Sequence, residues 1–192
     1  GHGKSRLSGR QDGQVRMTNL SICYTKNMKL YESGEYRASK DWPYAIAAGG
    51  IVYRTSGAGT EVLLLVREPG SYKGSHLDKV TSYHLPKGHL HQSETLEVTA
   101  IREIAEEAGV EAEIVTYLGA KQDEFEFRGL IHNKTVHYFA AKYIDEIQEM
   151  DNEHSSKEWF SVEDAVQLTS PPNTKGEDEF LRRLKKYLEL FA

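Results

Sequence analysis

The chain has 192 residues, of which 39% are hydrophobic and 28% charged, values that exclude a fibrous or disordered protein. A chain of this length favours a single domain with extensions. The formal net charge of -5 argues against a general nucleic-acid binder, although a few local Lys and Arg side chains or a bound metal can still hold a small anion.

The N-terminal segment, residues 1–43, is polar and shows no sustained hydrophobic period, so it is predicted to be a partly irregular extension. Its start lacks methionine, which suggests a processed tag or a truncation, and Gly1–Lys4 does not resemble a secretory signal. A hairpin is possible around Ser33 and Gly34. Pro43 favours an extended backbone before it, and the main domain is predicted over residues 44–192.

A lone cysteine, Cys23, offers no internal disulfide and no CxxC pair. No apolar run approaches the roughly 20 residues that a membrane-spanning helix needs. We therefore expect a cytoplasmic protein without a membrane partner. The sequence does not indicate whether the protein is a monomer or an oligomer.

Two apolar, β-branched runs at 45–53 and 62–66 predict a pair of strands joined by a flexible loop. A long polar segment follows at 67–82, with Lys73, His76 and Lys79, and a loop of this length is either functional or simply mobile. The next predicted elements, in chain order, are a helix at 95–108, strands at 113–117, 121–127, 134–143 and 159–160, a short helix at 165–168 and a last helix at 177–191.

The 95–108 helix is the best-defined element, because its apolar residues recur at the 3, 4 spacing of one helix face. Ser93 is predicted to cap its start, and Gly109 suits the left-handed position after its end. The short helix at 165–168 follows a capping-box pattern that begins at Ser161. The last helix is predicted to bury a stripe that extends as far as Phe191.

Three glutamates of the 95–108 helix are the first sign of chemistry. Glu103 lies three and four residues before Glu106 and Glu107, so the carboxylates share a helix face, where like charges repel. A hard divalent cation would compensate this repulsion, since Mg²⁺ prefers carboxylate and carbonyl oxygens and substrate phosphates. On its own, however, a Glu-rich helix is more often a solvated surface.

The wider spacing carries more information than the glutamates alone. Seven residues of one stretch match a spaced motif, and average residue usage makes such a match by chance on the order of one in a million. The seven are Gly88, Glu94, Arg102, Glu103, Glu106, Glu107 and Gly109. This stretch, Gly88–Val110, is similar to the Nudix box of the Nudix hydrolase superfamily. The resemblance implies an α/β fold, the Nudix-type α/β/α sandwich with a mixed central sheet, whereas residues 1–43 match no part of it.

The resemblance also implies roles within the motif. Glu106 and Glu107 would be metal ligands, with Glu103 either a third ligand or the base that activates water. Gly88 would let the chain bend so that the Lys87 carbonyl reaches a metal, whether Mg²⁺ or Mn²⁺. Arg102 and Glu94 would pair and orient the glutamates, and Gly109 would end the helix. The chemistry is consistent, since such metals neutralise phosphate charge and lower the pKa of bound water.

Finer resemblances point to asymmetrical diadenosine tetraphosphate hydrolases, and they lie in the segments Leu85–His89, Lys134–Tyr138 and Asn152–Trp159. By this likeness Lys87 and His89 would contact phosphates, Tyr138 would stack on a base and Glu153 would be a distal catalytic carboxylate. Two simpler readings stay open: Tyr138 as a half-buried strand residue, and Glu153 as part of a solvated acidic loop. The scattered histidines do not form the HExxH motif of zinc proteases.

The expected function is therefore Mg²⁺-dependent hydrolysis of a phosphoanhydride bond in a small nucleotide or diphosphate substrate. Diadenosine tetraphosphate, cleaved to ATP and AMP, is the leading candidate. The alternatives are an oxidised nucleoside triphosphate, a diphosphoinositol polyphosphate, an RNA 5′ end, or nucleotide sensing without turnover, since fold does not determine function.

Overall fold

The computed structural model describes residues 29–30, 36–38, 44–57, 59–70, 79–127, 129–171 and 176–191. A seven-stranded sheet forms the centre of this part of the chain. Its strands are β3 (Tyr44–Ser56), β4 (Gly59–Arg67), β5 (Ser82–His84), β6 (Lys87–His89), β7 (Val110–Phe127), β8 (Leu130–Glu146) and β9 (Ser156–Ser161). The described helices are α2 (Leu96–Ala108), α3 (Val162–Leu168) and α4 (Asp178–Phe191).

The sheet is mixed because β3 pairs in parallel with β8 and antiparallel with its other neighbours. The parallel register runs from Tyr44 opposite Asn133 to Tyr53 opposite Lys142. On its other side β3 is shared by two strands, β6 at residues 47–49 and β4 at residues 53–56. The short β6 strand therefore lies against the middle of the sheet, where β3 is buried along its length.

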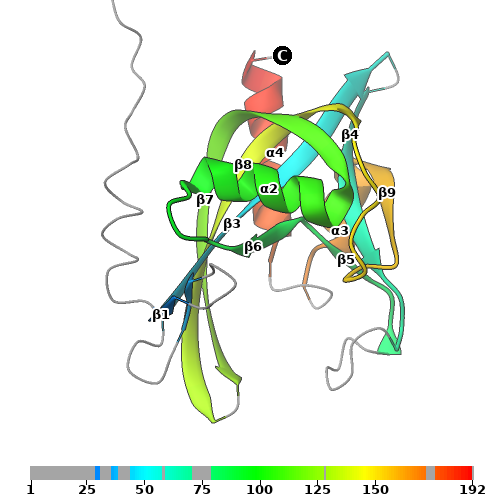
Figure 1. Cartoon of the computed structure of the whole chain (residues 1–192). Coiled ribbons are helices and arrows are strands. Elements are labelled where there is room, and N and C mark those ends of the chain that lie inside the picture. Colours follow the sequence, from blue (N-terminus) through cyan, green and yellow to red (C-terminus); the bar gives the residue numbers. More distant parts are fainter. Residues whose placement is uncertain are drawn as a thin grey trace, which may run out of the picture.

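The helices cover the two faces of the sheet separately, with α2 on one face and α3 and α4 on the other (Figure 1). Ile104 of α2 packs with Val52, Leu63 and Ala141, while Leu96 and Ala100 join Ile46 and Phe139. Across the sheet, residues of α3 and α4 pack on the opposite side chains of the same strands, and these helix residues are Ala165, Val166, Phe180, Leu181 and Leu184. The predicted α/β/α sandwich with a mixed sheet is confirmed.

Helix α2 begins and ends through specific caps. Thr95, not Ser93, is the N-cap, and its hydroxyl accepts a hydrogen bond from the Val98 amide at 3.3 Å. Ser93 instead adopts a positive φ of 67°, so the predicted cap was two residues too early. Gly109 has the predicted left-handed conformation, with φ 66° and ψ 25°, and its amide donates to the Ala105 carbonyl.

The two strands predicted at 113–117 and 121–127 are one continuous strand, β7. Around Leu118 and Gly119 the apolar alternation breaks, which made the sequence look like two elements. In the structure the register against β8 shifts between Tyr117 and Gly119, so a bulge absorbs the extra residue while the pairing continues. The end of β7 and the start of β8, before Asn133, extend past β3 as an arm (Figure 1). In this arm the two strands pair only with each other.

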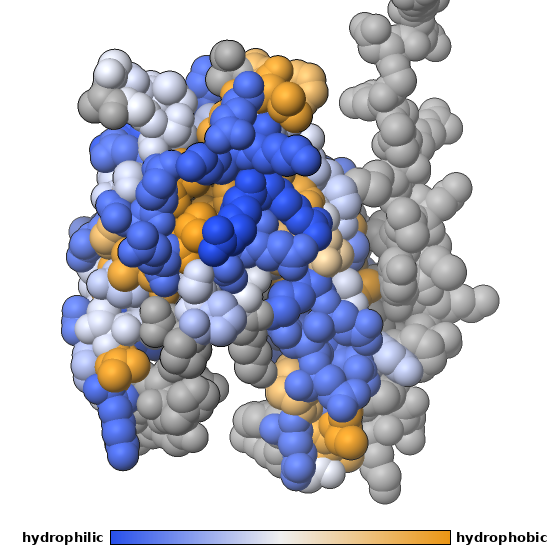
Figure 2. Space-filling model, turned by 180° about the vertical axis from the view of Figure 1, so that it is seen from behind, coloured by the Kyte–Doolittle hydropathy of each residue, from blue (hydrophilic) through white to orange (hydrophobic). Residues whose placement is uncertain are grey.

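The strands β3, β4, β8 and β9 and the last two helices lie at predicted positions but differ at their ends, whereas the three-residue strands β5 and β6 were not predicted. Helix α3 starts at Val162, earlier than predicted, and its N-cap is Ser161 of the capping-box pattern. In α4, Phe191 is 73% exposed and does not belong to the buried stripe. The face that carries α4 is mainly hydrophilic, with smaller hydrophobic areas among the charged side chains (Figure 2). None of the described helices has the length and apolar character that a membrane crossing requires.

In the N-terminal segment a short hairpin pairs β1 (Lys29–Leu30) with β2 (Tyr36–Arg37), and its turn lies outside the described residues. Ala38 follows β2 and is buried in the cluster that contains Leu96 and Phe139. Part of the segment predicted as an extension thus contributes to the core. Of the polar 67–82 segment, Lys73 and His76 also lie outside the described residues, and Lys79 is exposed.

Candidate active site

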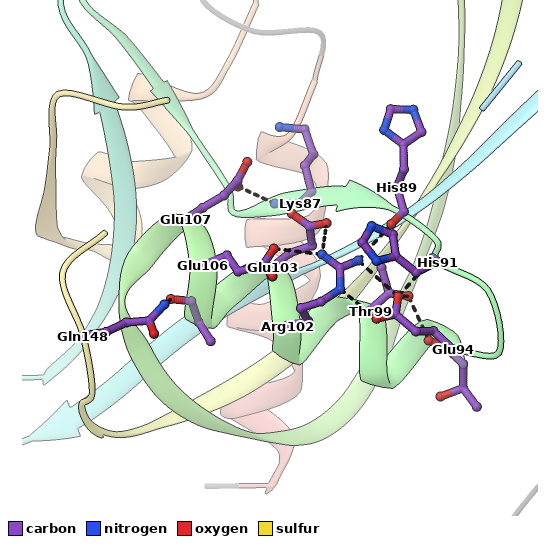
Figure 3. A network of polar contacts seen from close by, with 12 residues as sticks. Lys87, His89, His91, Glu94, Thr99, Arg102, Glu103, Glu106, Glu107 and Gln148 are labelled. Carbon is purple, nitrogen blue, oxygen red and sulfur yellow. Dashed lines mark hydrogen bonds and ion pairs between the residues drawn. The ribbon is translucent and has the colours of Figure 1, made fainter. Parts of the chain in front are cut away.

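The three glutamates of α2 lie in two different environments. Glu103 and Glu107, one helical turn apart, are each only 8% exposed and face β6. The side chain of Glu106 is 52% exposed and lies at the rim (Figure 3). Sequence spacing placed all three on one face, but only the i, i+4 pair is turned toward the sheet.

Strand β6 holds the buried pair at close range through its backbone. The Lys87 amide donates to Glu107 Oε2 at 2.8 Å. Opposite Glu103 the strand has Gly88, where an added Cβ would overlap the Glu103 carboxylate. A side chain at this position would displace the Glu103 carboxylate from its place against β6.

Arg102 organises the acidic cluster. Its guanidinium contacts both oxygens of Glu94, at 2.7 and 3.1 Å, which is the ion pair that the Nudix resemblance implies. It also donates to Glu103 Oε1 at 2.6 Å, to Glu106 Oε2 at 2.9 Å and to the His89 carbonyl at 2.9 Å. One planar five-donor group thereby joins the start of α2, its acidic face and β6.

Burial disfavours negative charge on Glu103 and Glu107, which we call the inner pair. Desolvation raises the pKa of Glu107 to about 7, with smaller upward contributions from Glu103 and Glu153 and opposing ones from Lys87. Desolvation likewise raises the pKa of Glu103, although Arg102 counteracts it. Two carboxylates that lose hydration without full compensation are suited to a cation, which would restore the missing positive charge.

The donor set fits a hard divalent metal in its chemistry. Glu103, Glu107 and the Lys87 carbonyl would supply oxygen ligands, and Glu106 would reach the metal from the rim. Among the described residues no three acidic, His or Cys side chains converge as a ready metal-binding group. Arg102 holds Glu103 and Glu106 instead, so metal binding requires these carboxylates to exchange a guanidinium contact for the cation.

Glu153 lies in the loop between β8 and β9, which is attached to the C-terminal end of α2. The Asp151 amide donates to the Glu106 carbonyl at 3.0 Å, and Gln148 Nε2 donates to the Ala105 carbonyl at 2.8 Å. Glu153 is exposed, and its charge is close enough to raise the pKa of Glu107. The loop therefore brings a distal carboxylate toward the inner pair.

The face of β6 away from α2 carries Lys87 and His89, whose side chains point to the same side of the strand (Figure 3). His89 is largely desolvated, and burial together with Lys134, Arg37 and His91 lowers its pKa to about 3. His89 is accordingly neutral at physiological pH, and the charges of Lys134 and Arg37 act on it.

Lys134 of β8 is a site residue that sequence reasoning missed. Burial and the neighbouring Lys87 lower the pKa of Lys134 to about 8, while Glu107 and Glu103 raise it. Its ammonium is therefore near both the basic and the acidic groups. Two signals were available: Lys134 begins one of the segments that resemble the tetraphosphate hydrolases, and it shares a strand face with the buried Val136 and Tyr138.

Tyr138 does not have the predicted position for stacking on a base. Its ring is 2% exposed and packs against Phe180 of α4, with centroids 4.4 Å apart. Its hydroxyl donates to Glu177 Oε1 at 3.2 Å. The base-stacking role that the resemblance implied is corrected to a core role, because this face of β8 turns the side chain under α4.

Fold and site together define an α/β/α sandwich domain in which a carboxylate-bearing helix faces a Lys-Gly strand. Residues 43–184 match the NUDIX domain model, and the chain belongs to this family. It is 32% identical over 124 residues to an asymmetrical bis(5′-nucleosyl)-tetraphosphatase of Caenorhabditis elegans, covering 64% of this chain and 83% of the relative. The structure of a C. elegans Ap4A hydrolase binary complex aligns with a TM-score of 0.55 and 28% identity, covering 77% of this chain and 99% of that one.

Another relative, a putative mutator protein MutT4 of Mycobacterium tuberculosis, is 36% identical over 81 residues, or 42% of this chain. The chain spans only 33% of that relative's length and 43% and 63% of two others. The similarity therefore concerns the domain, and each of these relatives contains regions without a counterpart in the match.

Proposed function

We propose that this domain is a metal-dependent pyrophosphohydrolase that cleaves a phosphoanhydride bond in a nucleoside polyphosphate, with diadenosine tetraphosphate as the leading substrate. The observation that carries the proposal is that two desolvated carboxylates, Glu103 and Glu107, lie near two lysines, Lys87 of β6 and Lys134 of β8. A chain of phosphates needs both parts: a place for a cation and lysines that bind oxygen.

Glu106 and Glu107 would hold Mg²⁺, or Mn²⁺ in its place, together with the Lys87 carbonyl, and Glu103 would be either a third ligand or the proton acceptor. When bound, the metal would neutralise phosphate charge and lower the pKa of a bound water. Glu103 is the better candidate for the proton acceptor, because it is buried with a raised pKa yet hydrogen-bonded to Arg102, which keeps its orientation. Glu153, at the loop near Glu107, is the second candidate.

On the other side, Lys87 and Lys134 would bind the phosphates that are not attacked. Lys87 is also part of the backbone contact to Glu107, so its main chain and side chain connect the two halves of the site. His89 is neutral and would donate a hydrogen bond to a phosphate oxygen without adding charge. Binding remote phosphates in this way aligns the reacting bond and so raises the rate.

The similarity to asymmetrical tetraphosphatases favours diadenosine tetraphosphate among the possible substrates. The test is a panel of diphosphate compounds incubated with Mg²⁺, with products identified by chromatography. The panel contains diadenosine tetraphosphate, ATP, an oxidised guanosine triphosphate and a diphosphoinositol polyphosphate. ATP plus AMP as the products from the dinucleotide, with lower kcat/KM for ATP alone, is the expected result.

Two ADP molecules as products, or equal kcat/KM for ATP and the dinucleotide, would refute the substrate assignment and leave the hydrolase class standing. Hydrolysis of none of these compounds at saturating Mg²⁺ would instead support nucleotide binding without turnover. An equilibrium binding measurement with the same compounds then identifies the ligand.

A further inference from the structure

Glu177 is a buried acid outside the Nudix-like stretch, and it reaches the candidate active site from the opposite end of the chain. It lies just before α4 and is 7% exposed. Its carboxylate pairs with Lys87 Nζ at 3.0 Å, and Lys87 is 90 positions earlier in the sequence. The pair therefore connects the C-terminal helix to the strand that faces the catalytic glutamates.

Three donors hold this carboxylate in place. Besides Lys87, the Tyr138 hydroxyl donates to Oε1 at 3.2 Å and the Leu85 amide donates to Oε2 at 3.2 Å. Burial opposes the charge of Glu177, but Lys87 and these hydrogen bonds hold its pKa below the usual value. A charged acid with donors on both oxygens is a fixed anchor, not a mobile surface group.

The Lys87 ammonium is only partly used by this arrangement. An ammonium has three donors, and the described residues show two acceptors for it, Glu177 Oε1 and the Leu85 carbonyl at 3.3 Å. These two acceptors leave the third N–H for a ligand oxygen, and the Lys87 side chain as a whole is 25% exposed. Glu177 thus restrains the flexible Lys87 side chain and leaves one donor of the Lys87 ammonium for a ligand.

Glu177 also competes with Glu107 for Lys87. The Glu107 carboxylate is the other anion whose field acts on the Lys87 ammonium. Without Glu177, Glu107 would be the carboxylate left to act on the ammonium, and the lysine would then neutralise a carboxylate that the proposed function assigns to the metal. The anchor therefore keeps the phosphate-binding cation and the metal-binding anion apart.

We propose that Glu177 is a positioning residue that holds the Lys87 ammonium in the orientation for a substrate phosphate. This inference rests on the proposed function, because it requires Lys87 to bind phosphate. The alternative is that Glu177 only fastens α4 to the sheet. A double-mutant cycle distinguishes the two, since a positioning residue acts on catalysis through Lys87 and a fastening residue does not.

The experiment measures kcat and KM for diadenosine tetraphosphate with saturating Mg²⁺, and the melting temperature, for Glu177→Gln, Lys87→Met and the double variant. We expect Glu177→Gln to lower kcat/KM roughly tenfold or more, mainly through KM, the scale of one charge-assisted hydrogen bond. In the Lys87→Met background the same substitution should change kcat/KM by less than about twofold. Glu177→Asp should recover part of the loss.

Asp178→Asn is the matched control. It changes the neighbouring acid at the start of the same helix in the same way, but Asp178 pairs with Arg182 on the surface and not with Lys87. We expect it to retain the kcat/KM of the unmodified protein. If Glu177→Gln does not fold, the cycle uses Glu177→Asp with Lys87→Met.

Equal losses from the Glu177 substitution in the presence and absence of Lys87 would overturn the inference and support the fastening role. A folded Glu177→Gln variant with unchanged kcat/KM would overturn it as well. If Lys87→Met itself is harmless, the phosphate role of Lys87 in the proposed function fails, and the inference fails with it. If the unmodified protein cleaves another compound of the panel, the cycle is measured with that compound.

Discussion

Glu107 combines burial with charge, and this combination makes its stability contribution depend on pH. Its pKa is raised to about 7 from 4.5, so the metal-free folded state binds a proton more tightly than the unfolded state. The stabilisation that this provides is fully present below pH 4.5 and is lost as the pH rises to about 7.

Glu107→Gln should remove this pH dependence because an amide does not titrate. We expect the difference in unfolding free energy between the variant and the unmodified protein, measured with chelator from pH 4 to 8, to grow in favour of the variant as the pH rises. The same variant should lose nearly all hydrolytic activity, since it lacks one ligand charge. Full turnover at saturating Mg²⁺ would show that Glu107 does not bind the metal.

Lys134 gives a second pH signature, in the alkaline range. With its pKa lowered to about 8, mainly by burial, its ammonium loses charge above that pH. If the ammonium binds phosphate, kcat/KM should decline as the pH rises through 8, and Lys134→Arg should move the decline to higher pH because a guanidinium stays charged. If kcat/KM declines at the same pH in both proteins, the decline is due to another titrating group.

At the scale of elements, α2 depends on Arg102 for its attachment to the preceding loop and to β6. Arg102→Ala would leave the buried Glu103 and the half-buried Glu94 without their guanidinium partner, and an unpaired buried charge typically costs on the order of 3 kcal/mol. We expect a lower melting temperature as well as a lower rate.

Arg102→Lys is the informative control for that change. It keeps the charge but lacks the planar fork that contacts Glu94, Glu103 and the His89 carbonyl together, so it should be intermediate in stability. A melting temperature of Arg102→Ala equal to that of the unmodified protein would exclude the organising role of the arginine.

For the whole molecule, metal binding and folding should be coupled. A cation that binds only the folded domain stabilises it by mass action, so the melting temperature should rise with Mg²⁺ concentration at constant ionic strength. The shift should disappear in Glu107→Gln and persist in Glu163→Gln, which changes an exposed acid on α3 that pairs with Lys185. A shift that is the same in all three proteins would indicate nonspecific binding.

The sequence by itself determined the features that depend on local spacing. Helical periodicity and a glycine suited to positive φ defined α2 and its end at Gly109, and the positions of Gly88, Glu94 and Arg102 indicated the acidic site around it. The order of the longer strands and helices also followed from short-range patterns, but the three-residue strands β5 and β6 and the continuity of β7 did not. These features depend on residues that are close in sequence, where neighbouring residues constrain one another directly.

Tertiary structure decided the rest, because it depends on which distant segments pack together. The orientation of α2 on the sheet separates Glu106 from Glu103 and Glu107, and the packing of α4 buries Tyr138 beneath Phe180. The nearness of Lys134 to Lys87 results from β3 lying between β6 and β8. Glu177 shows this most clearly: nothing near it in the sequence marks it as a partner of Lys87. Only the packing of α4 on the sheet brings a carboxylate from the far end of the domain against a lysine of the site and excludes the water that would otherwise screen them.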